Sequence, residues 1–477
     1  MLTHSAFQLR LLHAARGEPP AAPPASDPVV PLPSVTVQLP VFNERFVVEG
    51  LLDHVAALRY PRHLIEVQVL DDSTDETTEL VAEWIESFRA GTGDALEVSH
   101  VRRCSRDGFK AGALAAGLRR ARGELVAIFD ADFRPEPDFL ERVVPHFADP
   151  AVAVVQGRWG HANRDESALT RVSALLLDVH FDVEQVGRAA LGCFLNFNGS
   201  AGVWRAEAIR GCGGWRADTL TEDLDLSYRA QLRGWRIRYD GTLVVPAQLP
   251  GSMRALRAQQ QRWVKGGAEN ARQLVPRLLR ARQPLAVRVH ACAHLVEGCA
   301  YVALMLLAIL AAPVGLMIAR GLAPAWLALH PGVLLSFAAL APVYRFPQVR
   351  QRPARMACFA ADYVGFMVLA MGMAPGNAVA VLRGLAGRRT AFERTPKRGE
   401  RPGGYRQPRR AALNGAEVLL LAVSTGGLAL AVTAGAVLLT WPIGILVLAH
   451  AGVLVADLCT VDGAIGGRRH DRPLSDI

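Results

Sequence analysis

The sequence has little lysine and little cysteine. Of its 53 basic residues only Lys110, Lys265 and Lys397 are lysines, and its seven cysteines form no CxxC pair. The cysteines are too scattered for a disulfide framework or a zinc site, so we expect reduced thiols. The formal net charge of +9 suits an anionic membrane surface or nucleic acid. Because the basic residues cluster beside apolar segments, we expect membrane lipids and no nucleic acid as partners.

Residues 1–33 lack an apolar run of spanning length, because Arg10 interrupts the leucines around it. They do not read as a signal peptide, and we expect a disordered or amphipathic N-terminal arm before a cytosolic domain. The composition as a whole is nevertheless apolar, with 51% hydrophobic residues and a mean hydropathy of +0.18. Part of the chain is therefore expected to lie in a bilayer.

Long apolar stretches come after about residue 250. Residues 251–294 are basic and amphipathic, which is typical of helices at a membrane interface. Residues 295–460 are expected to form a transmembrane region. Its expected spans are about 295–319, 323–344, 415–440 and 442–459.

The stretch 356–382 lies between two basic loops, the second of which covers 383–410. If both loops stay in the cytosol, the stretch must cross the membrane an even number of times, and it is too short to cross twice. We therefore expect it to be interfacial or re-entrant, broken at Pro375-Gly376-Asn377. The tail 461–477 then returns to the cytosol, which predicts a multi-pass protein of the cytoplasmic (inner) membrane.

Residues 34–250 alternate apolar runs of strand length with helical patterns. This predicts an α/β domain with a mostly parallel sheet covered by helices on both faces. Ligands of such sheets bind beyond the carboxyl ends of the strands, where aspartates stand in this sequence. The expected strands are 35–39, 67–70, 96–98, 125–129 and 152–155.

Asp130 and Asp132 follow one of these strands, with one residue between them. Carboxylates with this spacing on an extended backbone point the same way, and a hard divalent cation accepts their oxygens together with those of a diphosphate. The pair is therefore a candidate clamp for a metal-bound nucleotide diphosphate, with Asp132 as the preferred direct ligand. Aspartates after strands are also common turn formers, and that alternative stays open.

Two further segments favour a nucleotide. Asp71 and Asp72 follow another strand and can hold a base and ribose, although Ser73 or Asp75 can equally cap a helix. Lys110 stands beside glycines at the start of a helix, where an ammonium and backbone N–H groups together suit phosphate.

Two later segments are ambiguous on their own. Thr219 and Glu222 have the spacing of a capping box, whereas Asp223 can take a proton from an acceptor hydroxyl. Gln259, Arg262 and Trp263 share one helix face. That face can lie on a membrane, or it can stack on a sugar and grip a diphosphate.

Taken together, the motifs resemble the family 2 glycosyltransferases of the cellulose-synthase-like kind, in particular the glucomannan (mannan) and glucan synthase subgroup with its bacterial relatives. The resemblance runs from about residue 35 to 267, and a further motif lies beyond it. The motifs are PVFNE (40–44), QVLDDSTD (68–75), KAGAL (110–114), FDADFRPEPDF (129–139), FNGSAGVWR (197–205), TED (221–223), QQQRW (259–263) and FERTPK (392–397).

The resemblance implies a GT-A (Rossmann-like) fold and an inverting transfer with Asp223 as general base. Asp130 and Asp132 would bind Mg²⁺ or Mn²⁺. Glu222, Gln259 and Trp263 would bind the acceptor. The implied nucleotide-sugar residues are Pro40, Asn43, Glu44, Asp72, Lys110, Asp130, Arg262 and Lys397.

The leading hypothesis is a hexosyltransferase that extends a β-linked polysaccharide from UDP-glucose or GDP-mannose. Single transfer to a lipid acceptor, as in the glucosylceramide synthase group, is the second, and a catalytically silent membrane scaffold or export partner is a third of another class. The family has transmembrane helices before the catalytic domain and this chain shows none, so a polymer channel built from the four spans alone is not implied. Ser200 replaces the usual threonine and keeps the hydroxyl. A homo-oligomer or an export partner is left open.

Overall fold

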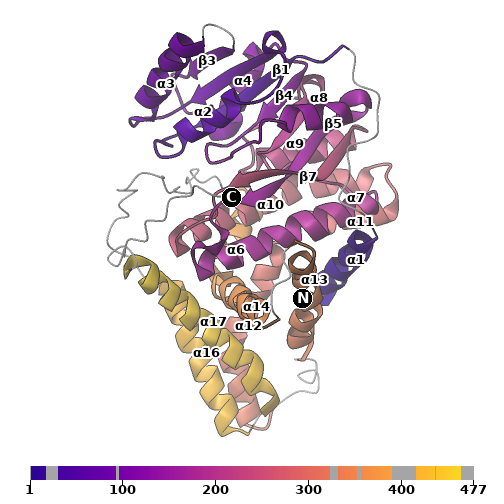
Figure 1. Cartoon of the computed structure of the whole chain (residues 1–477). Helices are drawn as coiled ribbons and strands as arrows, with labels where there is room; N and C mark the ends of the chain where they lie inside the picture. The colour runs from indigo at the N-terminus through magenta and orange to yellow at the C-terminus, as the bar shows by residue number, and fades with distance from the viewer. Residues whose placement is uncertain are drawn as a thin grey trace.

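Seven strands form one mixed sheet at one end of the molecule (Figure 1). The computed structural model describes residues 2–17, 31–92, 96–322, 331–351, 356–388, 415–435 and 437–462. Among the described strands the order is β3-β2-β1-β4-β6-β5-β7, and β6 runs antiparallel to both of its neighbours. The strands are β1 (Val35–Val41), β2 (Ile65–Asp71), β3 (Glu97–Arg102), β4 (Leu125–Ile128), β5 (Val152–His161), β6 (Gly202–Arg205) and β7 (Arg236–Ala247).

The five expected strands are present, and four of them have a buried apolar run, whereas β3 buries only Val98 and Val101. β1 and β4 are buried along almost their whole length, as strands covered on both faces must be. The sequence did not predict β6 or β7. β6 has only four residues, and β7 alternates buried with part-exposed positions. The antiparallel β6 makes the sheet mixed instead of purely parallel.

Helices cover both faces of the sheet and bury two apolar cores against it. One core includes Val37, Leu39 and Val67 from the strands, and the other includes Val126, Ile128 and Trp204. The first face carries α2 (Val48–Ala56), α3 (Thr77–Thr92) and α5 (Phe139–Val143), and the second carries α4 (Phe109–Arg120), α8 (Ala206–Gly211) and α9 (Glu222–Leu232). Further short elements are η1 (Arg62–Leu64), η2 (Val144–Ala148), η3 (Arg164–Glu166), α6 (Ala168–Val179), the π-helical η4 (His180–Gln185) and α7 (Val186–Ala190).

The second half of the chain is helical. Its first helix, α10, contacts α9 on the sheet side and α15 on the other, so it joins the two parts. In Figure 1 α12, α16 and α17 extend away from the sheet. The helices are α10 (Met253–Arg280), α11 (Leu285–Leu295), α12 (Cys299–Ala319), α13 (Pro331–Gln351), α14 (Met356–Gly372), α15 (Ala374–Leu385), α16 (Gly415–Thr433) and α17 (Val437–Asp462).

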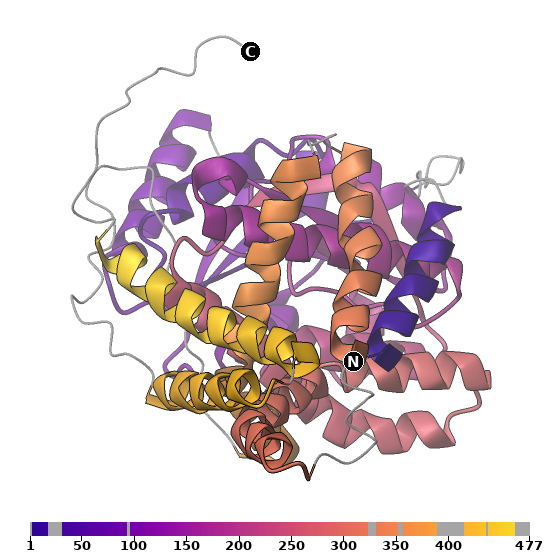
Figure 2. The same ribbon diagram turned by 90° about the horizontal axis from the view of Figure 1, so that it is seen from below.

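The expected N-terminal arm contains a docked helix, α1 (Leu2–Arg16). Its Leu11, Leu12 and Ala15 are buried, and the helix contacts α13, α7 and η4. Seen from below, α1 lies beside α13 (Figure 2). Residues 18–30 of the arm lie outside the described residues.

The expected spans stay a prediction, and the described helices bear on them only by length and composition. Within the described ranges no one helix is both long enough and apolar enough to cross a bilayer. The contiguous apolar stretches of α16 and α17, Glu417–Thr433 and Ile443–Ala456, are shorter than the ~20 residues required. Two bent pairs meet the requirement by length and composition: Leu285–Leu295 with Cys299–Val314, bent by 54°, and Met356–Gly372 with Ala374–Leu385, bent by 51°.

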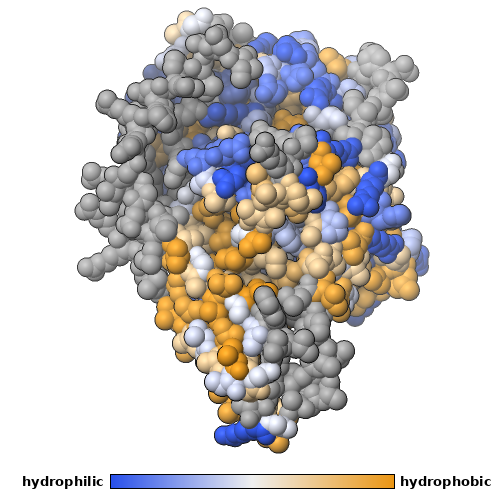
Figure 3. Space-filling model, turned by 60° about the horizontal axis from the view of Figure 1, so that its bottom comes forward, coloured by the Kyte–Doolittle hydropathy of each residue, from blue (hydrophilic) through white to orange (hydrophobic). Residues whose placement is uncertain are grey.

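The bend in the expected re-entrant stretch lies at Met373, just before the expected break at residues 375–377, which instead begin α15. The helical end of the molecule carries apolar surface, drawn in orange in Figure 3. Leu306, Ile309 and Leu310 of α12 are 44–52% exposed there. A face of this kind needs an apolar environment.

Gly117 allows α4 to approach the sheet closely, and its replacement tests that packing. A Cβ there would lie 2.5 Å from Gln38 Nε2 and 2.8 Å from Leu70 Cδ2. We expect Gly117→Ala to cost about 1–3 kcal/mol of unfolding free energy through overpacking. Gly50→Ala in α2, whose Cβ meets nothing within 4 Å, should be neutral or stabilising by about 0.4–1 kcal/mol. Thermal unfolding midpoints compare the two variants, and equal midpoints would contradict this account.

Candidate active site

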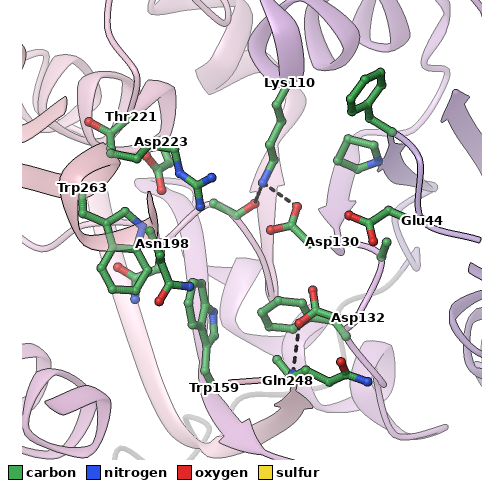
Figure 4. A pocket seen from close by; sticks show the side chains of 18 of the residues that line it. Glu44, Lys110, Asp130, Asp132, Trp159, Asn198, Thr221, Asp223, Gln248 and Trp263 are labelled. Atoms are coloured by element: carbon green, nitrogen blue, oxygen red, sulfur yellow. Dashed lines mark hydrogen bonds and ion pairs between the residues drawn. The ribbon is translucent and has the colours of Figure 1, made fainter. Parts of the chain in front are cut away.

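The predicted site residues gather around one pocket of about 190 Å³. It lies beyond the carboxyl ends of β1, β2 and β4, where parallel strands place their following loops at one edge. The starts of α4 and α9 and the middle of α10 complete its walls (Figure 4). The predicted residues that line it are Pro40, Glu44, Asp72, Lys110, Asp130, Asp132, Glu222, Asp223, Gln259, Arg262 and Trp263.

Lys110 links three segments of the pocket. Its Nζ donates to Asp130 Oδ1 at 2.6 Å and to the Gly199 carbonyl oxygen at 2.8 Å. Burial by itself would lower the pKa of Lys110, but the nearby carboxylates of Asp130 and Glu222 outweigh it and raise the pKa. The ammonium is therefore a fixed positive charge at the centre of the pocket.

Asp223 is the second residue of α9, and its carboxyl stands close to this ammonium. A Cβ built on Gly199 would be 2.9 Å from Asp223 Oδ2 and 3.3 Å from Lys110 Nζ, so only a glycine leaves the two groups in place. Burial and the neighbouring Glu222 raise the pKa of Asp223 to about 7, although Lys110 opposes the shift. Burial likewise raises the pKa of Glu222. A carboxyl with a pKa near neutrality can accept a proton and release it.

The expected capping box of Thr219 and Glu222 is wrong. The N-cap of α9 is Thr221, and its side chain makes no capping hydrogen bond. Thr219 Oγ1 instead donates to the Thr221 carbonyl oxygen. Glu222 and Asp223 of the first turn of α9 line the pocket, and Asp223 Oδ1 also accepts from Leu224 N of its own helix at 2.8 Å.

Asp72 is held by an arginine. Arg103 Nε donates to Asp72 Oδ1 at 2.8 Å, and Nη2 of the same side chain donates to Oδ2. Close by, the Arg106 guanidinium lies 3.3 Å from the centroid of the Phe42 ring, and burial lowers its pKa. This end of the pocket therefore combines a flat cation with an oriented carboxylate.

Asp132 is fixed by the backbone, since its Oδ2 accepts from Gln248 N at 3.0 Å. Asp130 N donates to Ser200 Oγ at 2.9 Å, so the hydroxyl kept by Ser200 has a partner. Among the described residues no three His, Cys, Asp or Glu side chains form a group that can hold a metal ion. The aspartate pair can therefore hold a divalent cation only together with oxygens from a ligand.

The α10 residues face the pocket from the side of the apolar helices. Arg262 lies in the field of Asp130, Glu222 and Asp223, and burial lowers its pKa. Gln259 and Trp263 line the pocket beside it, so the shared helix face is turned to the pocket. In Figure 4 Trp263 is on the same side of the pocket as Asp223.

Two predicted residues are not among those that line the pocket. Asn43, whose φ is +56°, ties the loop after β1 to the loop after β2 by accepting from Thr74 N at 2.8 Å. Lys397 and the rest of its motif lie outside the described residues. Six further residues with polar side-chain groups line the pocket and were not predicted as site residues. One of them, Asn198, belongs to the motif FNGSAGVWR but was given no role. They are Arg106, Trp159, His161, Asn198, Thr221 and Gln248.

The raised pKa of Asp223 has a consequence for stability. Its carboxyl has a pKa of about 7 in the folded protein against 3.8 for the ordinary group. A raised folded pKa means that the folded state binds the proton more tightly, so stability falls as pH rises from about 4 through 7. Asp223→Asn removes that loss. We expect its thermal midpoint to exceed that of the wild type by a few degrees at about pH 8 and to match it at about pH 4.5, whereas the exposed Asp218→Asn should change neither. Equal midpoints for Asp223→Asn and the wild type at about pH 8 would contradict this.

Two family models match overlapping parts of the chain. The model of Glycosyl transferase family 2 matches residues 36–202, and that of Glycosyl transferase family group 2 matches residues 125–343. Glucomannan 4-beta-mannosyltransferase 2 of Arabidopsis thaliana is 44% identical over 53% of this chain and 47% of its own length. Glucomannan 4-beta-mannosyltransferase 1 of Oryza sativa subsp. japonica is 41% identical over 53% of this chain and 49% of its own length. The chain thus spans about half the length of these relatives.

A solved structure supports the fold. The mannosyltransferase PcManGT from Pyrobaculum calidifontis, in complex with GDP-Man and Mn²⁺, superposes with a TM-score of 0.51 at 22% identity, over 82% of this chain and 100% of its own. This similarity confirms the GT-A fold implied by the motifs. Together with the identities over the motif-bearing part, the family matches show that the chain belongs to the family 2 glycosyltransferases, in the cellulose-synthase-like group.

Proposed function

We propose that this chain is a membrane-embedded inverting hexosyltransferase that extends a β-linked polysaccharide from a nucleotide sugar. The observation that carries the proposal is one pocket in which a carboxyl with a pKa of about 7, a part-buried lysine and a part-buried arginine converge. UDP-glucose and GDP-mannose are the candidate donors. The relatives are named as mannosyltransferases and the solved neighbour contains GDP-Man, so GDP-mannose is the first donor to test.

Asp223 is the general base of the proposed reaction. It takes the proton from the attacking hydroxyl of the acceptor as that oxygen bonds to the anomeric carbon of the donor sugar. The bond from that carbon to the diphosphate breaks on the opposite face, and its electron pair leaves with the diphosphate. One displacement of this kind inverts the anomeric centre without a covalent intermediate. Glu222, beside it, keeps the Asp223 pKa high and lines the acceptor side.

The cations of the pocket hold the leaving group. Negative charge develops on the diphosphate as the bond breaks, and Lys110 and Arg262 are fixed positive charges that need no reorganisation at that moment. Asp72 and Arg106 lie at the end of the pocket formed by the loops after β1 and β2. There a carboxylate suits a ribose hydroxyl, and a flat guanidinium suits the face of a base. Pro40 and Glu44 line the same end, and Asn43 shapes their loop.

The pocket offers a divalent cation two protein carboxylates, so the remaining ligands come from other groups. Asp130 and Asp132 supply hard oxygen ligands, and diphosphate oxygens and water would complete the coordination, since the described residues hold no cluster of three acidic, histidine or cysteine ligands. Mg²⁺ and Mn²⁺ are typically bound in this way. A bound cation would neutralise part of the diphosphate charge.

The acceptor side is aromatic. Trp263 and Trp159 both line the pocket, and their faces suit a sugar ring, while Gln259 adds hydrogen-bonding groups. This arrangement favours an acceptor that is itself a sugar. Transfer of one hexose to a lipid is the second candidate, favoured by the contact of α10 with the apolar helices. Product length separates the two, and absence of transfer from every donor would favour the silent scaffold.

We also place the chain in the cytoplasmic membrane. The supporting observations are the two bent apolar helix pairs and the exposed leucines and isoleucine of α12. In this arrangement residues 34–250 form the cytosolic catalytic domain and residues 251–294 carry the pocket helix along the interface. Residues 295–460 enter the bilayer, and 461–477 return to the cytosol.

Removal of the base tests the reaction. We expect Asp223→Asn to lower kcat about 10²–10⁴-fold while leaving nucleotide-sugar affinity within about threefold, because the base acts only in the transition state. Transfer is measured with labelled GDP-mannose and UDP-glucose and either Mg²⁺ or Mn²⁺, and the products are sized by mass spectrometry. In the wild type the rate should fall as pH drops through about 7. Glu207→Gln on the exposed surface is the matched control, and equal turnover by Asp223→Asn and wild type would rule out this role.

The membrane assignment has its own test. Membranes from expressing cells are washed with alkaline carbonate, which strips proteins held by charge alone. We expect the protein to stay in the membrane pellet, because the apolar face of α12 and its neighbours is stabilised by lipid. Quantitative release into the supernatant would contradict the embedded arrangement.

A further inference from the structure

A series of hydrogen-bonded polar side chains, buried or part-buried, connects the N-terminal helix α1 with the wall of the pocket. Gln8 of α1 donates from Nε2 to Glu184 Oε1 at 2.6 Å. Glu184 Oε2 lies 3.0 Å from His180 Nδ1, and His180 Nε2 lies 3.2 Å from Asn198 Oδ1. Arg188 Nη2 also donates to Glu184 Oε2, at 3.0 Å. Three contacts in series therefore connect α1 with Asn198, a residue that lines the pocket.

The direction of each hydrogen bond follows from the two groups whose roles are fixed. Arginine only donates, so Asn196 must turn its oxygen to Arg188 Nη1 at 3.4 Å and its amide nitrogen to Asn198 Oδ1. Asn198 Oδ1 is then an acceptor for both Asn196 and His180. The Asn198 side chain is thereby oriented, and its Nδ2 has no hydrogen-bond partner among the described residues.

His180 connects Glu184 with Asn198 in this series of hydrogen-bonded side chains. Both of its ring nitrogens face oxygens, one of the Glu184 carboxylate and one of the Asn198 amide. It begins η4, the single π-helical segment among the described helices. Such segments often occur at functional sites because they redirect side chains within a helix.

Glu184 is anchored as a carboxylate. Burial by itself would raise its pKa, but Arg188, with His180 and Gln8, holds the pKa well below its ordinary value. The anchor is supported from α1 by Gln8 and from α7 by Arg188. The Glu184 carboxylate therefore holds His180 at its Nδ1, on the side of the ring opposite Asn198.

We propose that His180 is a positioning residue, which holds Asn198 so that its amide NH₂ donates a hydrogen bond to the acceptor sugar. The inference rests on the proposed transfer reaction. A buried NH₂ without a partner costs free energy, and a sugar oxygen at the pocket wall would satisfy it. Figure 4 places Asn198 on the side of Asp223 and Trp263, across the pocket from Glu44 and Asp132. That side is where an acceptor hydroxyl must meet the base.

The test compares His180→Ala, Asn198→Ala and Asn198→Asp with the wild type in the full chain. Asn198→Asp keeps an oxygen that accepts from His180 and replaces the NH₂ group by a second carboxylate oxygen, which cannot donate and adds a negative charge, so Asn198→Ala is the uncharged comparison. We expect each variant to lower kcat/KM for the acceptor β-1,4-mannotetraose by about tenfold or more, the loss associated with an unsatisfied hydrogen bond. Donor affinity, measured by titration with GDP-mannose and UDP-glucose, should stay within about threefold.

The double variant His180→Ala with Asn198→Ala decides whether the two residues act as one unit. We expect it to be no worse than Asn198→Ala alone, whereas independent roles would multiply the losses. His63→Ala on the exposed surface is the matched histidine control. An unchanged acceptor kcat/KM in His180→Ala, or multiplied losses in the double variant, would overturn the inference.

Affinity for β-1,4-mannotetraose without donor, measured by isothermal titration, gives a readout that does not depend on transfer. Weaker binding by His180→Ala supports the inference, and equal binding by variant and wild type overturns it. Failure of the wild type to bind or use any donor would instead overturn the proposed reaction, so the two failures are distinct.

Discussion

The buried ammonium of Lys110 is the interaction on which the pocket depends. It contacts the end of β4 through Asp130 and the loop before β6 through the Gly199 carbonyl oxygen, and its charge acts on Asp223 and Glu222 at the start of α9. Without it, three carboxyl groups would face one another in a poorly hydrated space, and each would resist ionisation. The lysine therefore opposes the rise in the pKa of Glu222 and Asp223, and the carboxylates in turn raise the pKa of the lysine.

This balance explains why the pKa of Asp223 lies near neutrality. Burial and the adjacent Glu222 push it upward, and Lys110 pulls it back. A more buried site without the lysine would keep the carboxyl protonated, and a solvated one would leave it a weak base. The chemistry of the pocket is thus set by three charges that come from segments about 110 residues apart in the sequence, with Gly199 between them because no side chain fits there.

The sequence was informative wherever a local pattern determines position. Parallel strands end at one edge of a sheet, so Asp72, Asp130 and Asp132 could be placed near one another before any coordinates were known. The helix spacing of Gln259, Arg262 and Trp263 likewise determined a shared face. Partners distant in the chain were beyond such reasoning: Asp72 pairs with Arg103, and Gln8 with Glu184. The antiparallel β6 was missed because four residues carry no periodicity, and the capping box failed because Thr219 had another local partner. The expected spans stay a prediction, because a run of apolar residues does not reveal where a helix bends.

The docking of α1 on α13 has a consequence for how the chain folds during synthesis. Ser5 Oγ donates to the Ser336 carbonyl oxygen, a contact between residues 331 positions apart. At ~5–20 residues per second a ribosome needs roughly 20–60 s to make that interval. The contacts of α1 with η4 and α7 can form as soon as those segments are made, whereas its contact with α13 must wait for this longer interval. The packing of α1 is therefore completed in two stages, first on η4 and α7 and later on α13.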